Sequence, residues 1–156
     1  MVKVIDSFDG SIYGFLSNFY DCEVMYEGLM YHNSEAAFQS AKIKLDTEEA
    51  TISARNPFTA MAAGASKRAG RRVEIRPDWE TVKNNVMYEV LKDKFNRNSE
   101  LREKLLNTGE AILIEGNTWH DNYWGDCKCE KCKDIRGKNT LGILLMRVRK
   151  EIRNTV

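Results

Sequence analysis

The N-terminal part of the chain carries its apolar positions in short runs, and this pattern predicts strands and loops rather than long helices. Residues 2–8 are strand-like, while 14–20 mix aromatic and polar side chains without a period, which is typical of an ordered loop. Two further apolar runs, 22–25 and 29–31, flank Tyr26-Glu27-Gly28. A glycine between two such runs predicts a small β-hairpin.

The middle of the chain has helical periodicity. Asn33 or Ser34 is suited to cap a helix over 35–45, because both side chains accept hydrogen bonds from first-turn amides. Apolar positions at helical spacing predict further helices. They cover 48–55, 58–69, a long segment that Asp78 would cap and that extends through Phe95, and a segment capped by Ser99 that ends before Gly109.

The C-terminal part combines a compact apolar run, residues 111–115, with a last helix that Asn139 or Thr140 would cap. The run predicts a buried strand. Between these elements, residues 116–138 have no usable period, and such a stretch inside a compact domain usually carries function. The whole pattern predicts an α+β fold: a helix-rich single domain over 1–156 with a small β-sheet.

Composition and charge narrow the class of protein. The chain has 156 residues, 42% of them hydrophobic, which suffices for one domain with a core. Its formal net charge of +1 lacks the basic excess needed to capture nucleic acid through the backbone. No apolar run has the length of a secretory signal or a membrane span, so we expect a cytoplasmic protein without a membrane partner. One basic stretch, with Lys67, Arg68, Arg71, Arg72 and Arg76, is either a local phosphate pocket or a solvated helix end.

Glu35, Gln39 and Lys42 are spaced four and three residues apart, so they share one face of the predicted helix. That face is either a solvated charged stripe or a site that combines a carboxylate, an amide and an amine. Glu35 lies in the first turn, where the helix dipole favours the ionised form. It therefore suits a base or a charge stabiliser better than a proton donor.

The aperiodic stretch contains Asp121-Asn122-Tyr123-Trp124-Gly125, directly after His120. A pocket for a flat ring and a sugar uses such residues, because bases stack on aromatic faces and glycine allows close approach. The other interpretation is an aromatic plug under the loop. Two isolated candidates are Asn18, an amide beside aromatic side chains, and Trp79, which is either a core anchor or a ligand contact.

Three of the four cysteines, Cys127, Cys129 and Cys132, crowd together in the same stretch, unlike the scattered spacing of a disulfide framework. Three thiolates are one short of a closed tetrahedral zinc site. Cys22 or His120 would supply the fourth ligand, and a zinc ion there would be structural rather than catalytic. Reduced surface thiols are the alternative.

Short motifs follow one another along nearly the whole chain. They are GFLSNF at 14–19, SEAAFQSAK at 34–42, DWE at 78–80, DNYWG at 121–125 and GKNTLG at 137–142. In sequence and in order they resemble the YbiA-like family, also called the NADAR family. The cysteines between Gly125 and Asn139 are not part of that pattern.

The resemblance implies an α+β fold and an N-glycosidase, a hydrolase that acts on an N-glycosyl bond and requires no cofactor. Known members cleave the bond between a ribose phosphate and an amine on a pyrimidine in early riboflavin-pathway intermediates. Others remove ADP-ribose from guanine bases. The matched motifs imply functional roles for Glu35, Lys42, Trp79 and Asp121.

Two mechanisms are open. Glu35 and Asp121 would flank the anomeric carbon as catalytic carboxylates, one of them activating water. Alternatively, Lys42 attacks the ring-opened sugar and forms a Schiff base. The predicted substrate-binding residues are Asn18, Phe19, Gln39, Trp79, Trp124, Gly125 and Asn139.

The favoured function is hydrolysis of the N-ribosyl bond in phosphoribosylamino-pyrimidine intermediates of riboflavin biosynthesis. The alternatives are an ADP-ribosyl-guanine glycohydrolase and a module that binds NAD or ADP-ribose without hydrolysing it. The expected partner is a small ribosylamine or ADP-ribose-type substrate, and nucleic acid enters only as an ADP-ribosylated substrate. The two acids favour an enzyme, because a neutral binding pocket needs neither.

Overall fold

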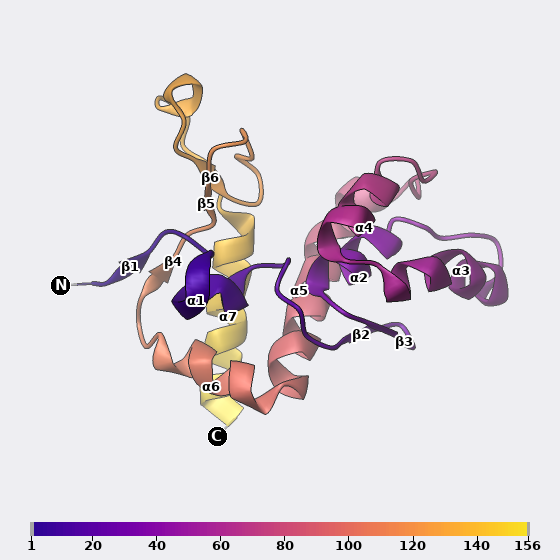
Figure 1. Ribbon diagram of the computed structural model, residues 1–156, viewed down its shortest axis with the longest axis horizontal. Coiled ribbons are helices and arrows are strands. Elements are labelled where there is room, and N and C mark those ends of the chain that lie inside the picture. The colour runs from indigo at the N-terminus through magenta and orange to yellow at the C-terminus, as the bar shows by residue number, and fades with distance from the viewer. Residues whose placement is uncertain (1, 156) are drawn as a thin grey trace. The chain divides into compact units, whose positions relative to one another are not determined.

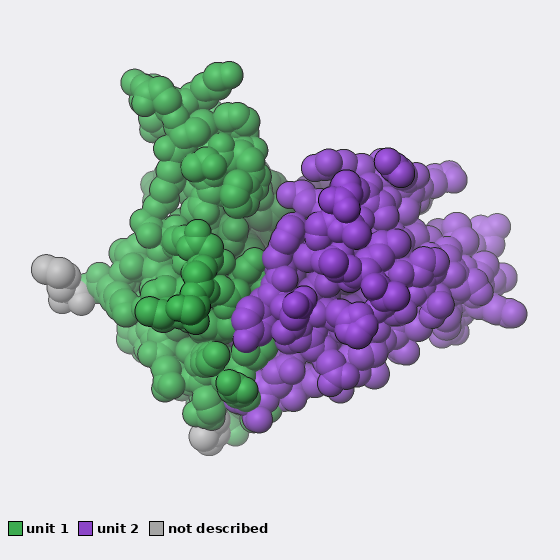
Figure 2. Space-filling view, viewed as in Figure 1, with its two compact units in different colours: residues 1–17, 100–156 green, residues 18–99 purple. Residues whose placement is uncertain are grey.

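The computed structural model describes residues 2–155, which form helices joined by short strands and loops (Figure 1). The chain divides into two compact units, residues 18–99 and residues 1–17 together with 100–156, coloured separately in Figure 2. Beside the helices, the described residues form three two-stranded sheets. The predicted helix-rich α+β class is confirmed, while the single domain over 1–156 stays a prediction.

Residues 18–99 fold around one short buried helix, α2. In chain order the elements of this unit are β2 (Val24–Tyr26), β3 (Leu29–Tyr31), α2 (Ser34–Ser40), α3 (Glu48–Arg55), a 3-10 helix (Asn56–Ala60), α4 (Ala63–Gly70) and α5 (Trp79–Arg97). All residues of α2 are buried, because the helix packs against α4, α5 and the hairpin strands. Ala36 and Ala37 have no exposed surface, and their small side chains permit this close packing.

The predicted hairpin is confirmed. β2 and β3 are antiparallel, with Val24 opposite Tyr31. Glu27 and Gly28 at its tip have φ angles of 44° and 86°. A two-residue hairpin loop of this kind needs positive φ at both central residues, and glycine adopts it without strain.

The helix predicted over 35–45 is too long, because α2 ends at Ser40. The carbonyl groups just after its end accept hydrogen bonds from Arg76 rather than from a further helical turn. The backbone N–H of Arg76 donates to the carbonyl of Lys42 at 2.9 Å, and the Arg76 guanidinium donates to the carbonyl of Ala41 at 3.4 Å. These bonds satisfy the helix end and redirect the chain.

Two other helix starts differ from the prediction. The helix expected over 58–69 begins at Ala63, because the preceding residues form the 3-10 helix with Pro57 in its first turn. Asp78 does not cap α5 with its side chain. Its two carboxylate oxygens instead accept from the Arg76 guanidinium at 2.6 and 3.0 Å, which orients the carboxylate toward that side chain.

The other unit is built from short strands and a long C-terminal helix. Its elements are β1 (Val4–Ile5), α1 (Gly10–Tyr13), a 3-10 helix (Gly14–Leu16), α6 (Ser99–Asn107), β4 (Ile112–Leu113), β5 (Gly116–Asn117), β6 (Asp126–Cys127), a 3-10 helix (Glu130–Cys132) and α7 (Thr140–Thr155). β1 pairs with β4 and β5 with β6, both in parallel. The predicted loop over 14–20 therefore begins as a helical turn, and the strand predicted over 111–115 is shorter.

α7 packs against β4 with the apolar face that its sequence predicts. Leu145 and Val148 are buried there. Gly142 faces the strand so closely that a Cβ atom would lie 2.1 Å from the carbonyl oxygen of Leu113, so no larger residue fits without a shift. Across residues 2–155, no helix has both the length and the apolar character needed to cross a bilayer.

Candidate active site

The first turn of α2 holds a buried carboxylate. Asn33 caps the helix by accepting the N–H of Ala36 at 2.7 Å, as the sequence predicts. Glu35 is 8% exposed, and its backbone N–H donates to the carbonyl of Asn18 at 3.0 Å. One helical turn later, Gln39 Nε2 donates to Glu35 Oε2 at 3.1 Å. The site therefore brings Asn18, Glu35 and Gln39 together.

Lys42 lies just after α2 and remains within electrostatic range of Glu35. Burial lowers the pKa of Lys42, the Glu35 carboxylate opposes that shift, and Arg71 adds to it. The three residues predicted to share a helical face are thus near one another, although the last of them has left the helix. A half-buried amine with a lowered pKa has a larger neutral fraction than a free lysine.

Three residues that either bond to Glu35 or precede it in the chain each have a buried side-chain oxygen with no hydrogen-bond partner within residues 2–155. These atoms are Asn18 Oδ1, Ser34 Oγ and Gln39 Oε1. Buried polar atoms are nearly always paired, so a group of unpaired ones beside a carboxylate points to a ligand that completes them. Ser34 was expected only as a helix cap, and its sequence position gave no sign of this second feature.

The Gln39 side chain is held against the end of α4. A Cβ atom on Gly70 would lie 1.9 Å from Gln39 Oε1 and 3.2 Å from its Cβ. The absence of a side chain at Gly70 therefore makes room for Gln39. The sequence pattern predicted only that a helix ends at residue 69, directly before Gly70.

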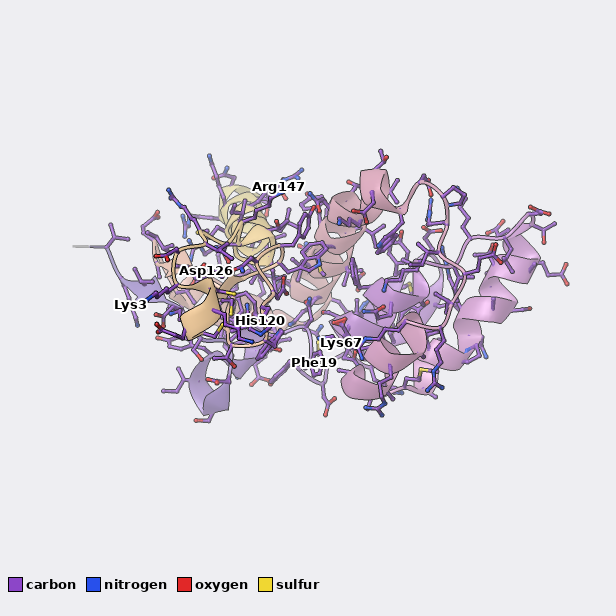
Figure 3. The ribbon with its side chains drawn as sticks, turned by 90° about the horizontal axis from the view of Figure 1, so that it is seen from above. Lys3, Phe19, Lys67, His120, Asp126 and Arg147 are labelled. Carbon is purple, nitrogen blue, oxygen red and sulfur yellow. The ribbon has the colours of Figure 1, made fainter. Side chains whose placement is uncertain are left out.

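The two aromatic candidates of this unit differ in exposure. Trp79 is 7% exposed, and its ring centroid lies 5.1 Å from that of Phe38 on α2. It therefore anchors α5 to α2. Phe19 is 47% exposed, and Lys67 Nζ lies over its ring at 5.9 Å; both are labelled in Figure 3. Phe19 is thus available to stack on a ligand, whereas Trp79 supports the helix that carries Glu35.

Asp121 organises the loop in which it lies. Its Oδ1 accepts the backbone N–H groups of Tyr123 at 3.1 Å and Trp124 at 2.9 Å. Asn117 holds the same residue from the other side, accepting the Asp121 N–H at 3.1 Å and donating to its carbonyl at 2.8 Å. Sequence reasoning did not select Asn117, because its partners become visible only in the folded loop.

The remaining predicted residues of this unit have structural contacts. Trp124 is half-buried, with the Tyr123 ring 5.0 Å away edge-on. A Cβ on Gly125 would lie 2.1 Å from the Glu115 carbonyl, so this glycine allows backbone to approach backbone. Asn139 directly precedes α7, and its carbonyl accepts the N–H of Ile143 at 3.0 Å. Its side chain binds the neighbouring strand region: Oδ1 accepts from Glu115 N–H at 2.9 Å, and Nδ2 donates to the Leu113 carbonyl at 2.8 Å.

The predicted site residues divide between the two units. Asn18, Phe19, Glu35, Gln39, Lys42 and Trp79 belong to residues 18–99, and Asp121, Trp124, Gly125 and Asn139 belong to the other unit. The structure describes the positions of these residues within each unit. The shared substrate of Glu35 and Asp121 stays a prediction.

A separate pocket of about 500 Å³ lies between the hairpin and α5. Its lining includes Tyr26, Glu89 and Asn96. None of the predicted site residues lines it. We therefore assign the candidate site to Asn18, Ser34, Glu35 and Gln39, called the α2 cluster below, rather than to this pocket.

The structure brings His120 to the cysteine trio. The ligand atoms of His120, Cys127, Cys129 and Cys132 all lie within 4.8 Å of one another. Cys22 belongs to the other unit, where burial raises the pKa of its thiol and Lys94 opposes that shift. Of the two candidates for a fourth ligand, His120 is the one that joins the three thiols.

Comparison with known proteins gives relatives that match most of the chain. N-glycosidase YbiA of Escherichia coli is 39% identical over 140 residues, which cover 90% of this chain and 82% of that protein. An N-glycosidase of Nostoc punctiforme is 36% identical, with 91% of this chain and 87% of the relative covered. A riboflavin biosynthesis protein of Vibrio vulnificus is 31% identical over 90% of this chain, which corresponds to 36% of that longer protein.

The fold agrees with the sequence comparison. The NMR structure of E. coli YbiA superposes with a TM-score of 0.78 at 33% identity, covering 99% of this chain and 88% of the other. A model of the NADAR domain matches residues 7–153, which is nearly the whole chain. The protein therefore belongs to the NADAR domain family.

Proposed function

We propose that this protein, an N-glycosidase by its family, hydrolyses the N-ribosyl bond of phosphoribosylamino-pyrimidine intermediates of riboflavin biosynthesis. The observation that carries the proposal is the α2 cluster, a buried Glu35 beside the unpaired polar atoms of Asn18, Ser34 and Gln39. A pentose presents hydroxyl groups that would pair with such atoms. The riboflavin biosynthesis name of the V. vulnificus relative favours this substrate class.

The reaction breaks the bond between C1′ of the ribose and the amine nitrogen. The bonding electrons go to the nitrogen, which takes up a proton, and positive charge builds on C1′ and the ring oxygen. An ionised Glu35 would stabilise that charge, and the first-turn position of Glu35 on α2 favours ionisation. Water then adds to C1′ and loses a proton to a carboxylate, for which Glu35 and Asp121 are the candidates.

Arg71 supports a phosphorylated substrate. It is the C-terminal cap residue of α4, close enough to Lys42 to lower the pKa of that amine. A cation at this position would attract the 5′-phosphate of the ribose. One residue of the basic stretch identified in the sequence would thus bind the substrate phosphate.

Lys42 offers a second mechanism. Its lowered pKa increases the fraction of neutral amine, which can attack C1′ of the ring-opened iminium form of the substrate and displace the pyrimidine amine, leaving a Schiff base between Lys42 and the sugar. Water then hydrolyses the Schiff base, which releases ribose phosphate and regenerates the lysine. Borohydride added during turnover would reduce this adduct and attach the pentose to the protein, and mass spectrometry would locate it. If no adduct forms while product accumulates, the Schiff-base mechanism is wrong and water is the nucleophile.

The decisive experiment incubates the full chain separately with a phosphoribosylamino-pyrimidine and with ADP-ribosylated guanine. We expect release of ribose phosphate from the first substrate. Release of ADP-ribose from the second alone would assign the alternative glycohydrolase function. Binding of ADP-ribose or NAD without any release would identify a binding module, and either result would contradict the proposal.

A further inference from the structure

Four metal-binding side chains meet in the loop between β5 and α7. His120 Nδ1 lies 4.0 Å from Cys127 Sγ, 3.3 Å from Cys129 Sγ and 3.5 Å from Cys132 Sγ. In a tetrahedral zinc site, Zn–S and Zn–N bonds of about 2.3 and 2.0 Å place neighbouring sulfur and nitrogen atoms roughly 3.5 Å apart. The observed distances bracket that value. The nitrogen–sulfur distances are therefore close to those around one zinc ion, and all four atoms lie within 4.8 Å of one another.

Hydrogen bonding alone does not account for this cluster. A neutral imidazole nitrogen carries either one proton or one lone pair, so His120 Nδ1 can pair with only one of the three sulfur atoms. Thiols are also weak donors and acceptors, which gain little from gathering around one nitrogen. A shared cation at the centre bonds all four atoms at once.

The surrounding backbone fixes the ligands in place. Cys127 ends β6, and its N–H donates to Asn122 Oδ1 at 2.9 Å. Cys132 donates its N–H to the carbonyl of Cys129 at 3.1 Å, which closes the turn that holds both thiols. His120 has a φ angle of 69°, a left-handed conformation that is uncommon outside glycine and clusters at functional sites. Figure 3 labels His120 in this loop.

We propose that His120, Cys127, Cys129 and Cys132 bind one structural Zn²⁺ ion. Four protein ligands leave no open position for water or substrate, so the ion serves the fold rather than the chemistry. His120 immediately precedes Asp121, and Cys127 closely follows Gly125. The metal therefore fixes both ends of the segment that carries the family motif DNYWG. This inference does not depend on the proposed reaction.

The test measures metal content of the full chain, purified under reducing conditions and without a histidine tag. We expect about one zinc ion per chain for the unmodified protein. Cys132→Ser and His120→Ala should each lower the zinc content several-fold. Cys22→Ser is the matched control for a cysteine outside the cluster, and His32→Ala is the control for a histidine, so both should retain the metal.

Cobalt supplies a second readout that is independent of activity. Co²⁺ added to the metal-free chain should give thiolate charge-transfer bands and the strong visible bands of tetrahedral coordination. Chelation of zinc should also increase amide hydrogen exchange within residues 116–139. If the reduced chain takes up less than about 0.1 zinc per chain and gives only weak octahedral cobalt bands, the site does not exist. The unmodified protein decides this even where a variant fails to fold.

Discussion

At the scale of single residues, the proposed catalytic role of Glu35 depends on the groups that stabilise its charge against burial. Glu35 is buried in the first turn of α2 and accepts one hydrogen bond from Gln39. Both the helix dipole and that donor favour the negative charge. The charge, rather than the shape of the side chain, should therefore determine the rate.

Glu35→Gln keeps the volume of the side chain and removes its charge. We expect the rate of glycosidic cleavage to fall on the order of a hundredfold or more, because stabilisation of the developing cation is lost. The measurement is steady-state product release, with thermal unfolding to verify that the fold persists.

Glu48→Gln is the matched control, since Glu48 also lies in a first helical turn but is exposed on α3. It should leave the rate unchanged. Near-normal turnover of the Glu35 variant would remove this residue from the mechanism.

Asp121 and Asn139 each make structural hydrogen bonds in addition to their predicted contacts with substrate. The Oδ1 of Asp121 already accepts two backbone N–H groups, and the amide of Asn139 links two backbone groups near β4. Sequence motifs mark both residues without saying which atoms are free. Their observed contacts explain why the loop needs these residue types, and their contacts with substrate stay predictions.

At the scale of elements, the contact between α4 and α2 places Gln39. Gly70 stands at the end of α4, where any side chain would overlap the Gln39 amide. The end of a glutamine side chain can rotate away, so the fold would tolerate a small addition while the amide lost its position.

Gly70→Ala should therefore reduce activity more than stability. We expect a rise in KM or a fall in kcat as Gln39 turns away from Glu35, with little change in the unfolding midpoint. Gly64→Ala on the same helix is the control, because its Cβ would meet only Arg68 at 3.7 Å. That variant should keep full activity and gain up to about 1 kcal/mol from helix propensity. Equal activity of the two variants would contradict the positioning of Gln39 by Gly70.

The elements predicted well are those specified by local chemistry. The hairpin follows from Glu27-Gly28 between apolar runs, and the Asn33 cap follows from hydrogen bonding within one turn. The helix end predicted at residue 45 was wrong because a distant group decides it, and α2 ends at Ser40 instead. The backbone N–H of Arg76 donates to the carbonyl of Lys42, and no local sequence pattern near Lys42 indicates this contact. Local interactions thus determine whether a segment forms a helix or a strand, whereas distant interactions also determine how long it is.

At the scale of the whole molecule, the fold places a lysine entirely inside the core. Lys94 on α5 has no exposed surface, and burial lowers its pKa to about 8, with Cys22 opposing the shift. In the unfolded chain the same amine titrates near its ordinary value of 10.5. Between these two pH values the unfolded state binds more protons, so the free energy of unfolding should rise with pH.

Lys94→Met should remove this pH dependence. We expect the unmodified protein to gain about 3 kcal/mol from Lys94 between pH 8 and 10.5 relative to the variant, as measured by urea unfolding at each pH. Lys92→Met, at an exposed position on the same helix, should follow the curve of the unmodified protein. Parallel curves for all three proteins would show that Lys94 titrates normally.

The sequence predicted the fold class and the family but not the two compact units. Family motifs fall in both, with Glu35 in residues 18–99 and Asp121 in the other unit. Residues 2–17 join the C-terminal part through the pairing of β1 with β4, whose partners Val4 and Ile112 are far apart in sequence. A parallel pairing between such short strands leaves no periodic trace in either strand, so only the folded chain reveals it.

The amide of Asn139 has a consequence for the chemical ageing of the protein. Deamidation would replace its nitrogen by oxygen, so a donor to the Leu113 carbonyl would become a second acceptor facing it. The two oxygens would repel, and the start of α7 would separate from the strand that it covers. Loss of a single ammonia molecule at this position would thus weaken the C-terminal half of the fold without any change in the encoded sequence.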